Sequence, residues 1–265
     1  MSYADVNGQR LWFEDSGGDG PPIVLSHGFL MDHTMFDPQV EALAPEYRCI
    51  RWDERGFGRT EDDGESFTYW DSAKDALGLM DHLGIEQAVL GGMSQGGFLS
   101  MRAALTAPER VRALVLMDTG SDCDDAETLA AYQLMNDMWV SPETSVEEHR
   151  GIAEAIAGII IGDPAASKPW VDAWEAEPRE RLRLPYACLV GREDITDRLG
   201  EITCPALVIH GTADAAISLE RAGKLRDGLP GCRGFVEVEG GSHASNMVMP
   251  DAVNPALLAF LREVA

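Results

Sequence analysis

The stretch that decides the fold is Val89-Leu90-Gly91-Gly92-Met93-Ser94-Gln95-Gly96-Gly97, an apolar run that ends in G-x-S-x-G and leads into an amphipathic segment. A chain that turns from strand to helix within about two residues leaves no room for side chains at Gly92 and Gly96. Such a turn strains the backbone of Ser94 and presents its hydroxyl alone, while the N–H of Gln95 points at any anion beside it. Glycine-rich turns with no catalytic role share this pattern, but the flanking strand and helix favour a nucleophilic serine.

Short apolar runs recur along the chain, of the kind that a parallel strand covered on both faces shows. Besides the run before Ser94, they occupy residues 23–25, 47–52, 113–117, 206–209 and 234–238. Amphipathic segments alternate with them at 36–43, 69–83, 98–107, 219–229 and 255–264. Before this series, 3–6 and 10–14 flank Asn7-Gly8, a hairpin signal that predicts two antiparallel strands. The alternation predicts an α/β fold, with a mostly parallel sheet and helices on both faces.

The alternation stops between residues 121 and 199, where helical segments follow one another. We interpret 121–199 as a helical cap inserted between two strands of a core that residues 1–120 and 200–265 form. Methionine and aromatic side chains at helical spacing most often pack in a core. A cap must still offer apolar side chains to a substrate, so Met135, Met138 and Trp139 are candidates for substrate binding.

A second loop is predicted to face Ser94. The strand at 23–25 ends in Ser26-His27-Gly28-Phe29. In a strand-to-helix loop of this kind, the backbone N–H of Phe29 can point at the same spot as the N–H of Gln95, which makes an oxyanion hole. We expect His27 to hydrogen-bond the loop into shape, because a base so near the strand end would lie on the wrong side of Ser94.

A glycine-containing loop, Asp53-Glu54-Arg55-Gly56-Phe57-Gly58-Arg59-Thr60, follows the strand at 47–52. Its glycines indicate a tight turn, and the simplest role for Asp53 and Arg55 is an ion pair that holds the turn together. A phosphate-binding loop is the alternative, but the spacing lacks G-x-G-x-x-G and no acidic ribose contact follows a second strand.

Two further residues are candidates to act with Ser94. Asp214 comes just beyond the strand at 206–209, at the edge where the sites of open parallel sheets lie. His243 lies on a glycine loop after the last strand, a placement that suits a mobile proton carrier. Asp118 also follows a strand and is the alternative acid, but the chain order serine, acid, histidine favours Asp214.

Composition limits the class of protein. The 265 residues carry a formal net charge of -24 at pH 7, so the surface lacks the basic groups that a nucleic-acid partner needs. No apolar stretch approaches about 18 residues and the N-terminus shows no leader pattern, so we expect neither membrane insertion nor export. The five cysteines are scattered and never form C-x-x-C, which argues against a disulfide framework and a zinc site. We expect a cytoplasmic protein without a bound metal.

Five ordered motifs together resemble the α/β-hydrolase family along nearly the whole chain. They are Ser26-His27-Gly28-Phe29, Asp53-Glu54-Arg55-Gly56-Phe57-Gly58, Gly92-Met93-Ser94-Gln95-Gly96-Gly97, Gly211-Thr212-Ala213-Asp214 and Gly241-Ser242-His243. Within the family the chain looks most like small capped esterases, 3-oxoadipate enol-lactonases and cofactor-free haloperoxidases. The resemblance implies an eight-stranded sheet, a helical cap and a catalytic triad of Ser94, Asp214 and His243. Gln95 stands where many such proteins carry methionine or leucine, so we expect a polar side chain in the pocket.

The expected function is hydrolysis of a small carboxylic ester or lactone through an acyl-enzyme, with no cofactor. Carbon–carbon bond hydrolysis of a vinylogous diketone, or perhydrolase and haloperoxidase activity, is the alternative at the same triad. A hydrolase fold that serves only as a binding module would not need Ser94, Asp214 and His243 together. The sequence does not determine the acyl chain, the leaving group or the oligomeric state. A homo-oligomer is one of the states that it allows.

Overall fold

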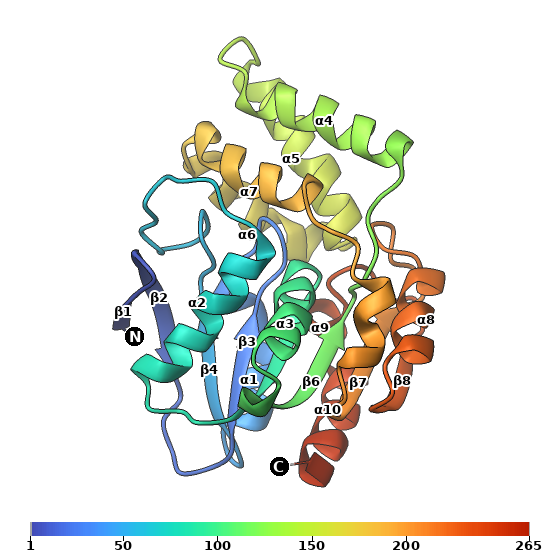
Figure 1. Ribbon diagram of the computed structural model, residues 1–265. Coiled ribbons are helices and arrows are strands. Elements are labelled where there is room, and N and C mark those ends of the chain that lie inside the picture. Colours follow the sequence, from blue (N-terminus) through green and yellow to red (C-terminus); the bar gives the residue numbers. More distant parts are fainter. Residues whose placement is uncertain (1, 265) are drawn as a thin grey trace.

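A single twisted sheet forms the centre of the computed structural model, which describes residues 2–264 (Figure 1). Its strands are β1 (Ser2–Val6), β2 (Gln9–Asp15), β3 (Pro22–Ser26), β4 (Arg48–Trp52), β5 (Ala88–Met93), β6 (Val111–Met117), β7 (Ala206–Gly211) and β8 (Cys232–Val238). The eight strands lie in the order β1-β2-β4-β3-β5-β6-β7-β8. Only β2 runs antiparallel to its neighbours, β1 and β4, and the other pairs are parallel. The predicted mostly parallel sheet is confirmed.

The strand order places the functional site. The chain goes from β3 to β4 on one side and then crosses back to pair β5 with the other side of β3. Helices on either side of such a reversal diverge, so a crevice opens at the carboxyl ends of the two strands. Phe29 follows β3 and Ser94 follows β5, and both residues therefore lie at this crevice.

Helices cover both faces of the sheet. Those of the core are α1 (Asp37–Leu43), α2 (Tyr69–His82), α3 (Gln95–Thr106), α8 (Leu219–Gly228), α9 (Ser245–Val248) and α10 (Pro250–Val264), with 3-10 turns at His33–Phe36 and Pro108–Arg110. Two further 3-10 turns, at Arg179–Leu182 and Thr196–Glu201, lie within or at the end of residues 121–199. One apolar cluster joins α2, α3 and α8 to one face of the sheet, and a second joins α1 and α10 to the other (Figure 1). This is the three-layer arrangement that alternating strands and helices predict.

Between β6 and β7 the chain forms α4 (Ala126–Val140), α5 (Val146–Ile160), α6 (Pro164–Ala176) and α7 (Arg183–Val190). These helices lie beyond the carboxyl ends of the strands and cover that edge of the sheet (Figure 1). Helices α5 and α6 join the same apolar cluster as α1 and α10. In α4 only Trp139 is buried, so this helix is the least embedded part of the layer.

The last helix begins earlier than the sequence predicts. Proline is favoured in the first turn of a helix, which is why the sequence suggests a start at Pro255. The structure begins α10 at Pro250, and Pro255 lies inside it. Val253 and Leu257 are fully buried on one side of the helix, and this apolar contact continues across Pro255. Within residues 2–264, no helix has the length and apolar character needed to cross a membrane.

Candidate active site

The turn between β5 and α3 holds Ser94 in a strained conformation, with φ 52 and ψ -114. A Cβ atom on Gly92 would lie 2.0 Å from the carbonyl carbon of Gly96, and one on Gly96 would lie 2.0 Å from the carbonyl oxygen of Ser26. Only glycine fits at either position, because the opposing atoms are backbone. The Ser94 N–H donates to the Met117 carbonyl at 3.0 Å, which ties the turn to the end of β6.

Asp214 and His243 meet beyond the ends of β7 and β8. The His243 Nδ1 lies 2.8 Å from the Asp214 Oδ2, and both side chains are almost fully buried. The other carboxylate oxygen of Asp214 accepts the backbone N–H groups of Ala216 and Ile217 at 2.8 and 2.9 Å. The carboxylate therefore has a fixed orientation, and its bond to Nδ1 leaves the Nε2 of His243 free for a proton transfer.

The charges of this pair shift both pKa values. Burial disfavours the charged ring of His243, but the charge and hydrogen bond of Asp214 outweigh it and raise the pKa of His243 above 6.5. Burial also works against the Asp214 carboxylate, yet its contacts with His243 lower the pKa of Asp214 below 3.8. The two shifts are opposite in direction, and both favour the ionised form of the group, as expected for an acid that stabilises a neighbouring imidazolium.

Asp118, the alternative acid, makes a different set of contacts. It accepts the N–H of Gly211 at 2.8 Å, and the N–H and hydroxyl of Ser245 at 3.2 and 2.7 Å. Burial, with the nearby charge of Asp214, raises its pKa to about 7. Asp118 thus joins the loops that carry Asp214 and His243, whereas the hydrogen bond to the imidazole comes from Asp214.

The two predicted oxyanion donors lie at the same edge of the sheet. Among residues 2–264, the backbone N–H groups of Phe29 and Gln95 donate to no other group. The Gln95 side chain, however, does not reach the pocket as the sequence suggested. It is buried in the core, where its Nε2 donates to Glu54 at 2.9 Å and its Oε1 accepts the Tyr69 hydroxyl at 3.2 Å. That expectation was wrong because the direction of a side chain at a helix start cannot be obtained from sequence spacing.

Ser94 and His243 line one cavity of about 100 Å³ beneath the helices of residues 121–199. No hydrogen bond joins them within the described residues, an arrangement often seen before a substrate binds. Apolar and aromatic side chains form most of the wall: Phe29, Phe98, Tyr132, Met135, Trp139, Ile156, Ile159, Ile160, Leu182, Tyr186, Leu189 and Ile217.

Of the three cap residues predicted to contact substrate, two lie on this wall. Met135 and Trp139 line the cavity. Met138 does not, and its side chain is 40% exposed. Met138 follows Met135 by three residues, but α4 turns its Trp139 side inward, so Met138 points toward solvent. The prediction for Met138 was wrong.

A family model described as the alpha/beta hydrolase fold matches residues 21–250. The chain belongs to the α/β-hydrolase fold family. An esterase from Thermogutta terrifontis has a TM-score of 0.87 at 29% identity, with 99% of this chain and 98% of that chain covered. The enol-lactonase from Burkholderia xenovorans LB400 has a TM-score of 0.86 at 28% identity, covering 98% and 99%. The 3-oxoadipate enol-lactonase 1 of Acinetobacter baylyi is 26% identical over 269 residues, which cover 97% of this chain and 95% of that protein.

In this α/β-hydrolase, the polar part of the cavity wall was not predicted from the sequence. Arg192 and Asp124 line the cavity and form an ion pair at 2.8 Å, with 3% and 4% of their side chains exposed. The guanidinium lies 4.8 Å from the centre of the Phe98 ring. Asn136 is also on the wall. The sequence offers no signal for these residues, because Asp124 and Arg192 are far apart in the chain and belong to no motif.

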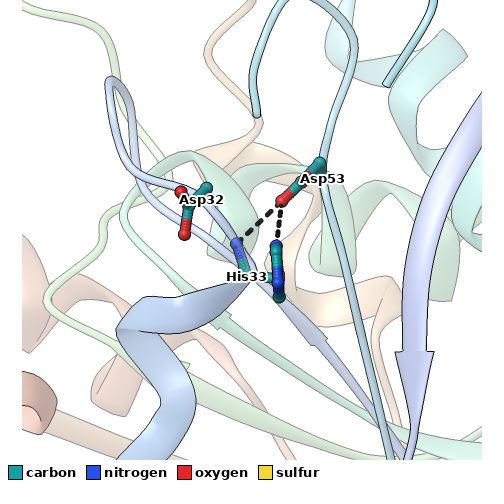
Figure 2. A group of neighbouring side chains, drawn as sticks. All are labelled: Asp32, His33 and Asp53. Atoms are coloured by element: carbon teal, nitrogen blue, oxygen red, sulfur yellow. Dashed lines mark hydrogen bonds and ion pairs between the residues drawn. The ribbon is translucent and has the colours of Figure 1, made fainter. Parts of the chain in front are cut away.

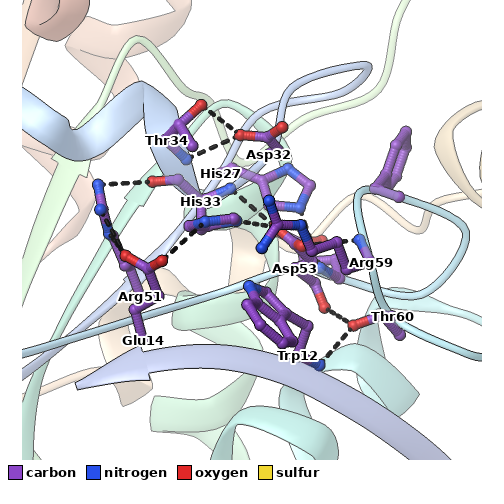
Figure 3. Close-up of polar contacts among 12 residues, drawn as sticks. Trp12, Glu14, His27, Asp32, His33, Thr34, Arg51, Asp53, Arg59 and Thr60 are labelled. Atoms are coloured by element: carbon purple, nitrogen blue, oxygen red, sulfur yellow. Dashed lines mark hydrogen bonds and ion pairs between the residues drawn. The ribbon is translucent and has the colours of Figure 1, made fainter. Parts of the chain in front are cut away.

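Asp53 organises the loop that follows β4 in this α/β-hydrolase, and Figures 2 and 3 show its contacts. Its Oδ1 accepts the N–H and the Nδ1–H of His33 at 2.9 and 2.7 Å, and its Oδ2 accepts the N–H of Arg59 at 2.8 Å. The predicted ion pair between Asp53 and Arg55 is wrong. Arg55 instead pairs with Asp75 on α2, with its Nε 2.5 Å from Oδ2.

Asp53, with two residues that follow β3, forms a candidate metal-binding cluster. Asp32, His33 and Asp53 lie close enough together to hold a metal ion, as Figure 2 shows. The oxygens of Asp53 already accept donors from His33 and Arg59, and Asp32 accepts the N–H and hydroxyl of Thr34. Burial opposes a charged ring, but Asp53 raises the pKa of His33. We assign this cluster a structural role, since its polar atoms already have partners.

Proposed function

We propose that this protein is a serine hydrolase that cleaves a small carboxylic ester or lactone through an acyl-enzyme. The observation that carries the proposal is the 2.8 Å pair of His243 and Asp214 at a cavity whose wall also holds the strained Ser94. A serine hydroxyl is a weak nucleophile at neutral pH, and an adjacent oriented imidazole activates it. The similarity to an esterase and to enol-lactonases gives independent support.

The proposed reaction has two halves. The Ser94 Oγ attacks the acyl carbon while the Nε2 of His243 takes its proton, and Asp214 stabilises the imidazolium. The carbonyl oxygen becomes an oxyanion that accepts hydrogen bonds from the amides of Phe29 and Gln95. The bond to the leaving oxygen then breaks, and His243 returns the proton to that oxygen. Water repeats the sequence on the acyl-enzyme and releases the acid and Ser94.

The cavity wall indicates a substrate with a mainly apolar body. Met135, Trp139 and the isoleucines of α5 would cover such a body and exclude water. Arg192 and Asp124 offer a polar contact on the same wall. Because Asp124 is paired with both Arg192 and Arg221, its charge is compensated, and we expect a neutral polar group on the substrate to be accepted there.

All five cysteines are free in the structure, at positions 49, 123, 188, 204 and 232. Free thiols persist in the reducing environment of a cytoplasm. We therefore propose that the protein acts in that compartment.

The test is a panel of chromogenic short-chain esters, lactones and a vinylogous diketone, measured with the wild type and Ser94→Ala. We expect ester or lactone turnover that falls by about four orders of magnitude in Ser94→Ala. His243→Ala should lose nearly as much, because the residues act as a unit. Circular dichroism checks that both variants are folded. Turnover of the diketone alone, or of esters by folded Ser94→Ala, would contradict the proposal.

A further inference from the structure

Glu54 is hydrogen-bonded to both segments that carry the proposed oxyanion amides. It follows β4, on the loop that contains Asp53, and only 2% of it is exposed. Its backbone N–H donates to the Nε2 of His27 at 2.9 Å, and its side-chain Oε2 accepts the Nε2–H of Gln95 at 2.9 Å. One residue is therefore bonded to the loop after β3 and to the first residue of α3.

The bond to His27 fixes the Phe29 amide. Because the His27 Nε2 accepts a hydrogen bond from the backbone N–H of Glu54, the ring hydrogen of neutral His27 is on Nδ1, which donates to the Gly28 carbonyl at 2.8 Å. Burial lowers the pKa of His27, which favours this neutral ring. The peptide between Gly28 and Phe29 is trans, so its N–H points away from the fixed carbonyl. The Gly28 carbonyl also accepts the N–H of Met31 at 3.0 Å, so the Glu54 backbone is one of the contacts that set the direction of the Phe29 donor.

The bond to Gln95 fixes the second donor. The Gln95 side chain is held between the Glu54 carboxyl and the Tyr69 hydroxyl, and all three residues are buried. Gln95 is the first residue of α3, where its N–H has no acceptor within the helix. A side chain held at both ends limits rotation of the backbone that carries this N–H.

A buried acid with one side-chain partner needs an explanation. The Oε1 of Glu54 has no hydrogen-bond partner among the described residues. Burial, together with the charges of Asp75 and Asp53, raises the pKa of Glu54 well above 4.5, which favours the neutral acid. A neutral acid can accept from Gln95 without placing a negative charge behind the developing oxyanion.

We propose that Glu54 is a positioning residue that sets the two halves of the oxyanion hole relative to each other, through His27 on one side and the Gln95 side chain on the other. This inference rests on the proposed function. It predicts that the Glu54 side chain affects the stabilisation of a tetrahedral anion at Ser94 and leaves binding of the uncharged substrate nearly unchanged.

The experiment compares Glu54→Met and Glu54→Gln with the wild type. Glu54→Met keeps the length but removes the acceptor, and we expect kcat to fall about 10- to 100-fold while KM stays within about twofold. Glu54→Gln keeps an acceptor oxygen for Gln95 and should hold kcat within about threefold. Affinity for phenylboronic acid, which forms a tetrahedral anion on a serine, should fall in Glu54→Met in parallel with kcat. Trp139 on the cavity wall provides a fluorescence signal for that titration.

A matched control separates positioning from general destabilisation. Gln9 at the start of β2 is buried and hydrogen-bonded to Asp63, further along the loop that follows β4, and Gln9→Met removes a polar contact of similar size. It should lower the melting temperature without changing kcat or boronate affinity. If Glu54→Met does not fold, Gln95→Met breaks the same bond from the other side while keeping the backbone donor. We expect it to lower kcat and boronate affinity in the same way.

The two proposals fail in different ways. If the wild type turns over esters and Ser94→Ala does not, the proposed function holds. The positioning role is then overturned if folded Glu54→Met, or folded Gln95→Met in its place, keeps wild-type kcat and boronate affinity. It is also overturned if Glu54→Gln loses as much kcat as Glu54→Met. A wild type that neither binds phenylboronic acid nor hydrolyses any ester or lactone contradicts both proposals.

Discussion

His243 must be neutral to accept a proton from Ser94, and its surroundings favour the charged form. Asp214 raises the pKa of His243 through its charge and hydrogen bond, and the charge of Asp118 acts in the same direction. Burial opposes both but does not outweigh them. The position of the acid limb of the activity profile therefore reports on the partner of the histidine.

We predict that kcat/KM of the wild type rises with pH on a limb centred above pH 6.5, the ordinary pKa of the ring. Asp214→Asn removes the raising influence and leaves the burial that lowers the pKa. The limb should therefore move to lower pH while the plateau falls. Rate profiles from pH 5 to 9, roughly the range in which imidazole titrates, measure this shift. A limb that stays in place in folded Asp214→Asn would mean that another group orients the histidine.

The two acids should differ in the size of their effect. We expect Asp214→Asn to lower kcat about 10³- to 10⁴-fold, because the imidazole loses its orientation. Asp118→Asn should cost much less, since Asp118 binds Gly211 and Ser245 and makes no hydrogen bond to the ring. Steady-state kinetics on folded variants give both numbers. The opposite ranking would assign the acid role to Asp118.

For single residues, the sequence predicts the position in the fold better than the direction in which the side chain points. Asp214 and His243 could be placed at strand ends from the alternation alone, and the structure brings them to 2.8 Å. The Gln95 side chain and the Asp53 partner could not be predicted, because both depend on which way a side chain leaves a tight loop. The Glu54 contacts were missed for the same reason.

Among the elements, the strand-to-helix turn at Ser94 is the most constrained by sterics. Gly92→Ala should destabilise the fold by about 3 kcal/mol, because the new Cβ would meet the backbone of Gly96. Gly151→Ala is the matched control within α5, where a Cβ meets nothing within 4 Å. It should stabilise the protein by about 0.5 to 1 kcal/mol. Urea unfolding measures both, and equal stabilities would contradict the packing argument.

Helix α4 provides a second comparison, between two methionines three residues apart. Met135 lines the cavity, whereas Met138 is 40% exposed and does not. Met135→Ala should lower kcat/KM for an apolar ester about tenfold, through lost contact with the substrate. Met138→Ala should stay within about twofold, as expected of a surface substitution. A loss in Met138→Ala as large as or larger than that in Met135→Ala would contradict this orientation of α4.

Element types were predictable because most of the parallel strands are short apolar runs, β1 and β2 flank a hairpin signal, and the longer core helices are amphipathic segments. Boundaries were less so, and α10 shows why. The apolar contact of Val253 with the core continues the helix across Pro255, and this contact is not visible in local propensity. The helices of residues 121–199 could be predicted as helical, but not which of their side chains reach the cavity.

For the whole molecule, the order of strands and helices determines where the site lies. The crossover from β4 to β5 places Phe29 and Ser94 on adjacent strand ends, and the chain between β6 and β7 covers them. This arrangement could be predicted from the alternation of strands and helices and from its interruption at residues 121–199. The cavity itself does not, because its wall comes from residues as distant in sequence as Phe29 and His243.

The central claim is that Ser94 is the nucleophile of a hydrolase, and covalent labelling tests it most directly. The purified protein is treated with a fluorophosphonate ester, which phosphonylates activated serines, and is then analysed by intact mass and peptide mapping. We predict one adduct per chain, located on Ser94 and absent from folded Ser94→Ala and from His243→Ala at short times. An adduct on a different serine, or equal labelling of the wild type and Ser94→Ala, would contradict the account.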